Sequence, residues 1–270
     1  MPRIKVRDAE LYYETHGEGE PLVLIPGFGT GLWLWFKQTE AFARRFRTIV
    51  FDPRGMGRSE GGRTNATIRA CADDVAALLL ALGVERAHVL GVSFGGFVAQ
   101  EFALAHTRNL VKLVLCCTSF GGARHLLPSE SVLRAMASAE GLNTEERTRR
   151  NLRPAFAPKF LAERTEEVEE FIALRLRHPV GESAHRAQLQ AAATFDAGSR
   201  VSRIEAPTLV VTGDEDAIML PENSRNLAAC IPGARLSIIE GAAHMVFIER
   251  AEEFNRAVIE FLEERSATRL

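Results

Sequence analysis

A serine lies in a glycine-rich turn that suits a catalytic nucleophile. Residues 91–96 read GVSFGG, directly after a strand-like run at 87–90 and directly before a helical pattern. A serine on a tight strand-to-helix turn is held in a strained conformation, and its glycine neighbours avoid collisions with adjacent segments. Its hydroxyl projects at a helix N-terminus, where backbone N–H groups favour developing negative charge. Ser93 is therefore the candidate nucleophile, and a capping serine in an ordinary glycine turn is the simpler alternative.

A serine hydroxyl needs a base to accept its proton, and the base needs an orienting carboxylate. With this type of nucleophile turn, the acid and then the histidine follow the serine along the chain. Of seven histidines, only His244 follows the last strand-like run, in a loop of small residues. The preceding run, 207–212, leads into the acidic turn 214–216. We take Asp216 as the acid because it lies furthest round that turn, and Asp214 is the alternative.

Acyl transfer also requires N–H donors for the oxyanion that forms on the substrate. A second glycine turn, PGFG at 26–29, follows the strand-like run at 22–25. We expect the backbone N–H groups of Phe28 and Phe94 to form the oxyanion hole. Their side chains, with Phe120, are the candidates for an apolar substrate pocket.

The composition excludes several classes of partner. Lys and Arg number 33 against 35 Asp and Glu, a net charge of −2. This balance gives no general attraction to nucleic acid or anionic lipid. No apolar run approaches the roughly 18 residues of a membrane span, and the first ten residues lack the apolar core of a secretory signal. We therefore expect a cytoplasmic protein that binds neither nucleic acid nor membrane.

The four cysteines indicate free thiols. They lie at positions 71, 116, 117 and 230 and form no C-x-x-C pair. A disulfide framework or a zinc site is therefore not expected. The reaction outlined above needs no other metal and no organic cofactor, so we predict none.

Strand-like runs and helix-length segments alternate in the first half of the chain. This order predicts a mostly parallel α/β sheet flanked by helices, with an antiparallel start because the first strands are too close for crossover helices. The strand-like runs are 11–15, 21–25, 47–51, 87–90, 111–117, 207–212 and 235–240. Between 121 and 199 such runs are absent, and Arg/Glu-rich amphipathic stretches occupy 129–140, 144–152, 158–177 and 182–195. We expect a core of residues 1–120 and 200–270, with an inserted helical cap at 121–199.

With these residues in view, the chain resembles the α/β-hydrolase superfamily over nearly its whole length. Residues 52–59, DPRGMGRS, are similar to the family's D-x-R-G-x-G-x-S turn, which is mainly structural. Residues 213–216, GDED, are similar to the segment whose fourth residue is the triad acid, which supports Asp216. The resemblance implies an eight-stranded α/β-hydrolase sheet with a cap. Serine as nucleophile, rather than aspartate, argues against haloalkane dehalogenases and epoxide hydrolases.

The layout is most similar to 3-oxoadipate enol-lactonases and related small carboxylic-ester hydrolases. This resemblance implies cleavage of a small ester or lactone through an acyl-enzyme, and we expect a monomer or homodimer. Carbon–carbon bond hydrolases, perhydrolases and aminopeptidases use the same triad and remain alternatives. A ligand sensor with slow turnover is an alternative of another class. Four cap residues are candidates for binding a substrate carboxylate, and the sequence does not choose among them: Arg124, His125, Arg134 and Arg175.

Overall fold

The computed structural model describes residues 2–61, 67–137 and 142–264. Its strands form one sheet in the order β1-β2-β4-β3-β6-β7-β8-β9, and β5 pairs with β2 outside this path. The strands are β1 (Arg3–Val6), β2 (Ala9–His16), β3 (Glu20–Ile25), β4 (Phe46–Phe51), β5 (Glu60–Gly61), β6 (Ala87–Val92), β7 (Leu110–Cys116), β8 (Thr208–Gly213) and β9 (Arg235–Ile239). β1, β2 and β5 pair antiparallel, whereas β3, β4 and β6–β9 are parallel to one another.

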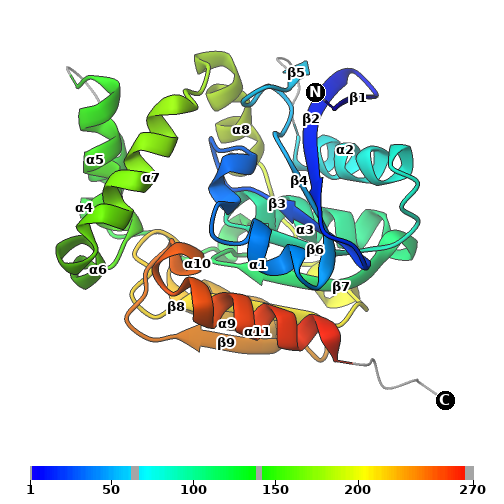
Figure 1. Ribbon diagram of the computed structural model, residues 1–270. Coiled ribbons are helices and arrows are strands. Elements are labelled where there is room, and N and C mark those ends of the chain that lie inside the picture. The colour runs from blue at the N-terminus through cyan, green and yellow to red at the C-terminus, as the bar shows by residue number, and fades with distance from the viewer. Residues whose placement is uncertain (1, 62–66, 138–141, 265–270) are drawn as a thin grey trace.

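Helices flank the sheet on both faces and fill the segment between β7 and β8 (Figure 1). The α-helices are α1 (Thr39–Ala43), α2 (Ile68–Ala81), α3 (Phe94–Ala105), α4 (Glu130–Ala137), α5 (Thr144–Ala155), α6 (Pro158–Glu163), α7 (Thr165–Arg177), α8 (Glu182–Ala193), α9 (Pro221–Cys230), α10 (Val246–Glu249) and α11 (Ala251–Glu263). We call α4–α8 the cap helices. Within the described residues, no helix is both long and apolar enough to cross a membrane.

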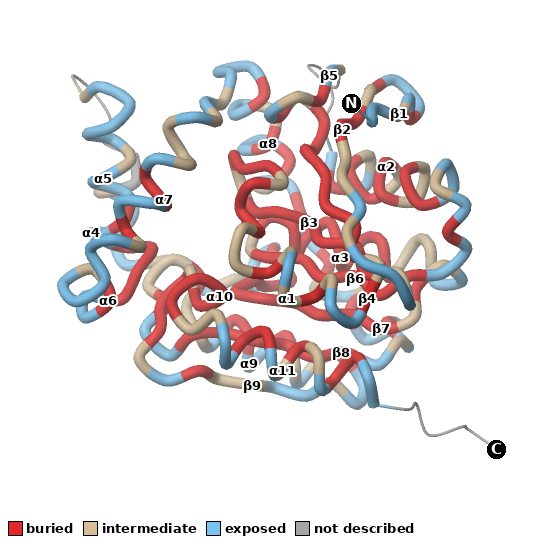
Figure 2. The backbone as a smooth tube through the Cα atoms, viewed as in Figure 1, coloured by how far each residue is buried: buried red, intermediate tan, exposed pale blue. Residues whose placement is uncertain are grey.

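The central strands are buried (Figure 2). Their alternate residues belong to two different cores, one on each face of the sheet. In β3, Val23 and Ile25 belong to the first core, which α2, α3 and α9 cover. Leu22 and Leu24 belong to the second core, which contains residues of α1, α10 and α11. Successive residues of a strand point to opposite faces, and a parallel sheet needs cover on both. This explains why these strands read as continuous apolar runs.

The second core also extends into the cap. Phe156, Phe160 and Phe171 of the α5–α7 region are buried in the same cluster as Trp35 and Phe247. The cap helices therefore share apolar packing with the sheet, although the division into a core of 1–120 and 200–270 and a cap of 121–199 stays a prediction.

The structure refines the expected helices. The expected stretch 158–177 breaks at Arg164, whose backbone leaves the helical region, and forms α6 and α7. The cap region thus contains five α-helices among the described residues, where four were expected. The end of the stretch 129–140 lies outside the described residues. Among the described strands and α-helices, five were not predicted, and all but α9 have five residues or fewer: β1, β5, α1, α9 and α10.

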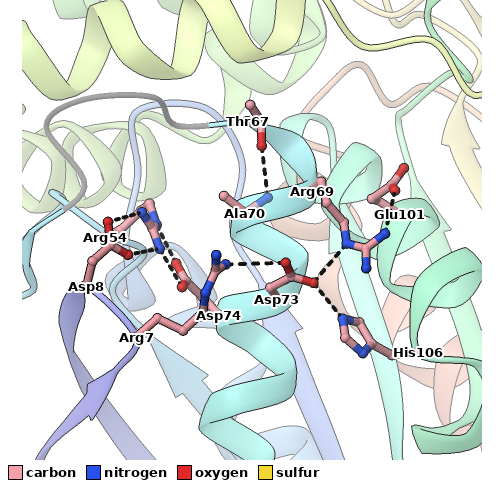
Figure 3. A network of polar contacts seen from close by, with 10 residues as sticks. All are labelled: Arg7, Asp8, Arg54, Thr67, Arg69, Ala70, Asp73, Asp74, Glu101 and His106. Atoms are coloured by element: carbon pink, nitrogen blue, oxygen red, sulfur yellow. Dashed lines mark hydrogen bonds and ion pairs between the residues drawn. The ribbon is translucent and has the colours of Figure 1, made fainter.

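A network of ion pairs fixes α2 against the start of the sheet (Figure 3). Arg54 donates to both carboxylate oxygens of Asp74, at 2.5 and 2.6 Å, and also binds Asp8. Both Arg54 and Asp74 are buried, and these hydrogen bonds raise the pKa of Arg54. Asp73, on the adjacent position of α2, binds Arg69 and His106 nearer the surface. The pair Arg54–Asp74 is therefore the buried centre of this network.

Replacing Arg54 by Met is expected to destabilise the fold by about 3–5 kcal/mol, because it leaves the Asp74 carboxylate buried without its counter-ion. Urea unfolding measures this free energy. The matched control is Arg69→Met, which removes pairs with Asp73 and Glu101 from an arginine side chain that is 55% exposed. Each of these acids keeps another partner, His106 or Arg200, so this change should cost about 1 kcal/mol or less. Equal effects of the two substitutions would contradict the prediction.

Candidate active site

Ser93 lies in the turn between β6 and α3 with φ +54° and ψ −116°. This conformation is costly for a residue with a side chain and persists only where the surroundings enforce it. A Cβ on Gly91 would collide with the carbonyl group of Gly95, and a Cβ on Gly95 would collide with the backbone of Ile25 and Pro26. The glycines therefore allow the turn to pack against β3, as expected from the motif.

His244 and Asp216 form a buried pair at the same edge of the sheet. His244 Nδ1 lies 2.8 Å from Asp216 Oδ2, and both side chains are nearly inaccessible. The second oxygen of Asp216 accepts hydrogen bonds from the N–H groups of Ile218 and Met219. These bonds fix the carboxylate so that it orients the imidazole. The competing carboxylate, Asp214, instead accepts from the N–H of Gly241.

The end of β7 connects Ser93 to this pair. The N–H of Ser93 donates to Cys116 O at 2.9 Å. The thiol of the next residue, Cys117, lies within 4.8 Å of ligating atoms of both Asp216 and His244. Among the described residues, Ser93 Oγ has no hydrogen-bond partner. Of the three candidate catalytic residues, only Asp216 and His244 are therefore joined by a hydrogen bond within the described residues. Hydrogen bonds to a catalytic nucleophile are often long before substrate binds.

Cys117, Asp216 and His244 also form the one group in the described chain with spacing that suits a metal ion. All three are buried, and burial raises the pKa of the Cys117 thiol well above its usual value. A cation there would compete with the hydrogen bond between Asp216 and His244. The absence of a functional metal remains a prediction.

The two N–H groups predicted to form the oxyanion hole belong to residues near Ser93 in the structure. Within the described residues, neither the N–H of Phe28 nor that of Phe94 has a hydrogen-bond acceptor. Phe94 is the first residue of α3, and Phe28 follows Gly27, where an added Cβ would lie 3.7 Å from Ser93 Cβ. Free donors on both sides of a nucleophile can bind the oxygen of a tetrahedral intermediate.

Aromatic side chains surround this turn. The rings of Phe28 and Phe94 meet edge to face at 6.2 Å, and His185 of α8 packs on Phe28 at 4.8 Å. Phe120, the third candidate pocket residue, is buried in the first core beneath the Arg124 guanidinium. The participation of these three phenylalanines in substrate binding stays a prediction.

Of the four cap candidates, Arg175 is the one that contacts the glycine turn at residues 26–29. Its guanidinium donates to Gly29 O, while Gln188 accepts from the N–H of the same glycine. Arg124 binds Gly198 O at the surface, and Arg134 pairs with Glu130. The fourth, His125, is half-buried, and its Nδ1 has no partner among the described residues.

Glu249 was not singled out from the sequence, yet it lies beside the histidine loop. Its carboxylate is buried and accepts from the N–H of Ala243 at 2.9 Å and of Ala157 at 2.8 Å. Burial raises the pKa of Glu249 to about 7. The signal that was available is an acidic residue that ends the apolar run Val246–Ile248.

Ionisation of Glu249 is expected to lower stability as pH rises. Its folded pKa of about 7 exceeds the reference value of 4.5, so the folded state holds the extra proton between these values. The contribution to the free energy of unfolding is therefore complete below about pH 4.5 and decreases progressively above it, by about 3 kcal/mol in total once pH has risen through about 7. Urea unfolding at pH 5 and pH 8 should show this loss in the wild type and not in Glu249→Gln. Parallel pH dependence of the two proteins would contradict the prediction.

The fold and this site define a member of the α/β-hydrolase class. The family model of the alpha/beta hydrolase fold matches residues 20–251. The chain therefore belongs to the α/β-hydrolase family, and both the expected fold class and the resemblance are confirmed. The expected number of eight strands was wrong: the described residues form nine, because the two-residue β5 pairs with β2 beside the eight-strand path.

Several proteins that are similar over nearly the full length of the chain are described as hydrolases. RutD of Azorhizobium caulinodans, a proposed carbamate hydrolase, is 32% identical, with 97% of this chain and 98% of that protein covered. A 2-hydroxy-6-oxononadienedioate/2-hydroxy-6-oxononatrienedioate hydrolase of Pseudomonas putida is 31% identical, with 95% and 92% covered. The enol-lactonase structure from Burkholderia xenovorans LB400 superposes with a TM-score of 0.85 at 29% identity, with 97% and 100% covered. The protein is thus a hydrolase of this family.

Proposed function

We propose that the protein is a serine hydrolase that cleaves a small carboxylic ester or lactone through an acyl-enzyme. The observation that carries this proposal is the buried hydrogen bond between His244 and Asp216 beside the strained turn of Ser93. Its substrate is a small molecule, and it acts as a monomer or homodimer without a cofactor. The turn, the oriented histidine and the free N–H groups each support one requirement of acyl transfer.

In the proposed reaction, Ser93 Oγ attacks the carbonyl carbon while His244 Nε2 accepts the hydroxyl proton. Asp216 holds the imidazole in the tautomer that leaves Nε2 free and stabilises the imidazolium. The N–H groups of Phe28 and Phe94 bind the oxyanion. The carbon–oxygen bond to the leaving group then breaks, and His244 returns the proton to the leaving oxygen. Water, deprotonated by His244, hydrolyses the acyl-enzyme and restores Ser93.

Covalent labelling with a fluorophosphonate tests the mechanism directly. Intact-mass analysis of the wild type should show one adduct, and peptide mapping should place it on Ser93. Hydrolysis of p-nitrophenyl acetate, butyrate and octanoate with a burst equal to the enzyme concentration would establish the acyl-enzyme. A wild type that is neither labelled nor active would overturn the proposal.

The surroundings of Arg175 support a substrate that carries a carboxylate. The side chain, which comes from cap helix α7, is half-buried, and within the described residues no acidic group lies within ion-pair distance of it. Burial and the charge of Arg147 lower the pKa of Arg175. It binds the loop that begins at Gly27, beside Ser93. An anionic group of the substrate, a few bonds from the scissile carbonyl, would balance this charge.

Replacing Arg175 by Met should therefore weaken hydrolysis of an anionic ester selectively. For p-nitrophenyl hydrogen glutarate we expect kcat/KM to fall about 10- to 100-fold, the effect of a charged hydrogen bond, while the value for p-nitrophenyl butyrate changes less than about threefold. Arg177→Met, an exposed site on the same helix, is the matched control. Equal losses for both substrates would show that Arg175 only supports the loop at Gly29.

Carbon–carbon bond hydrolysis is the second candidate function, and the likeness to the Pseudomonas putida hydrolase favours it. Labelling of Ser93 without turnover of any ester would support it over ester hydrolysis. A ligand that raises the melting temperature without being consumed would instead support the slow-turnover sensor.

A further inference from the structure

Three hydrogen bonds tie the histidine loop to the cap. We define this loop as residues 241–245. The N–H of Met245 donates to Ala155 O at 3.0 Å. The Glu249 carboxylate accepts from Ala243 with one oxygen and from Ala157 with the other. The residues on both sides of His244 are therefore bound, directly or through Glu249, to the junction between α5 and α6.

This junction is suited to hold a neighbouring loop in place. It is buried, with Phe156 only 1% and Ala157 0% exposed. Pro154 and Pro158 flank it and restrict its backbone. Its phenylalanine shares the second core with Phe247 of α10, the short helix that carries Glu249 (Figure 1). A displacement of the junction would therefore be transmitted to the loop through a packed and hydrogen-bonded contact.

We propose that Glu249 is a positioning residue that couples the cap to the base, His244. The inference rests on the proposed function, since it concerns the geometry of that base. Glu249 is suited to the task because a carboxylate offers one acceptor oxygen to each of two N–H donors. Buried N–H groups that lose their acceptor are costly, so both segments move when the carboxylate is removed. A misplacement of about 1 Å far from the reacting atoms is enough to slow catalysis about 10²-fold.

The test uses Glu249→Gln in the full-length protein at pH 8, where the wild-type carboxylate is ionised. Glutamine keeps the shape but places an NH₂ group against one of the two N–H donors. We expect kcat and the rate of fluorophosphonate labelling both to fall about 10²-fold, with KM changed less than about threefold. Hydrogen exchange of segments 155–157 and 241–245 should accelerate together. Glu253→Gln, an exposed acid on α11, is the matched control and should leave all three measurements unchanged.

Glu249→Asp separates geometry from charge, because it keeps the charge but is too short to reach both N–H groups. The proposal predicts a loss in Glu249→Asp similar to that in Glu249→Gln. It is overturned if Glu249→Asp retains wild-type kcat, or if both variants unfold at lower temperature yet label Ser93 at the wild-type rate while folded. Failure of the proposed function appears separately, as a wild-type Ser93 that is not labelled. The exchange measurement then decides alone whether Glu249 links the two segments.

Discussion

Ser93→Ala is expected to reduce kcat for p-nitrophenyl esters by about 10⁵- to 10⁶-fold, in line with the loss of a whole serine triad. Ser93 supplies the atom that becomes acylated, so neither His244 nor the oxyanion donors can replace it. The residual rate would come from binding and from the N–H groups of Phe28 and Phe94. Stopped-flow assays of the purified variant should show no burst, and a fluorophosphonate should leave its mass unchanged.

Ser93→Gly provides the control for backbone strain at this position. Glycine adopts φ +54° without the steric cost of a Cβ, so this variant should be as inactive as Ser93→Ala but more stable by about 1–2 kcal/mol, the strain typical of such a residue. The comparison would show that strain is retained for the nucleophile at the expense of stability. Activity of either variant above about 10% of wild type would remove Ser93 from the nucleophile role.

The sheet was largely predictable from the sequence because its strands are buried on both faces. Runs such as 21–25 and 111–117 are apolar except for Lys112, and their ends differ from those of the observed strands by at most one residue. Short elements were missed for physical reasons. β5 has two residues, and α1 and α10 have five and four, too few to show a helical period. Their positions depend on packing rather than on local pattern.

The candidate site was predictable to the extent that each residue follows a recognisable strand. Ser93, Asp216 and His244 come after β6, β8 and β9, whose carboxyl ends gather at one edge of the parallel sheet. Glu249 and Arg175 could not be selected in this way. Their significance depends on contacts with Ala157 and Gly29, which lie 92 and 146 residues away along the chain.

Asp216→Asn is expected to lower kcat by about 10⁴-fold, as the corresponding change does in a serine protease. The size of the side chain is preserved, but one of its two oxygens becomes an NH₂ group. This NH₂ group must face either His244 or the N–H groups of Ile218 and Met219. If the amide NH₂ faces His244, the ring is bound in the tautomer that carries its proton on Nε2 and cannot accept the proton of Ser93. Steady-state assays above pH 7 measure the loss.

Asp214→Asn is the matched control, because both residues lie in the same acidic turn after β8. Asp214 Oδ1 accepts the N–H of Gly241 at 2.7 Å at the exposed end of the histidine loop, and an asparagine oxygen can accept the same bond. This variant should therefore retain kcat within about threefold of wild type, with a loss of stability of about 1 kcal/mol or less. The contrast depends on the single hydrogen bond between Asp216 and His244. If instead Asp214→Asn lost more activity than Asp216→Asn, the orienting role would pass to Asp214, and the buried pair would be structural.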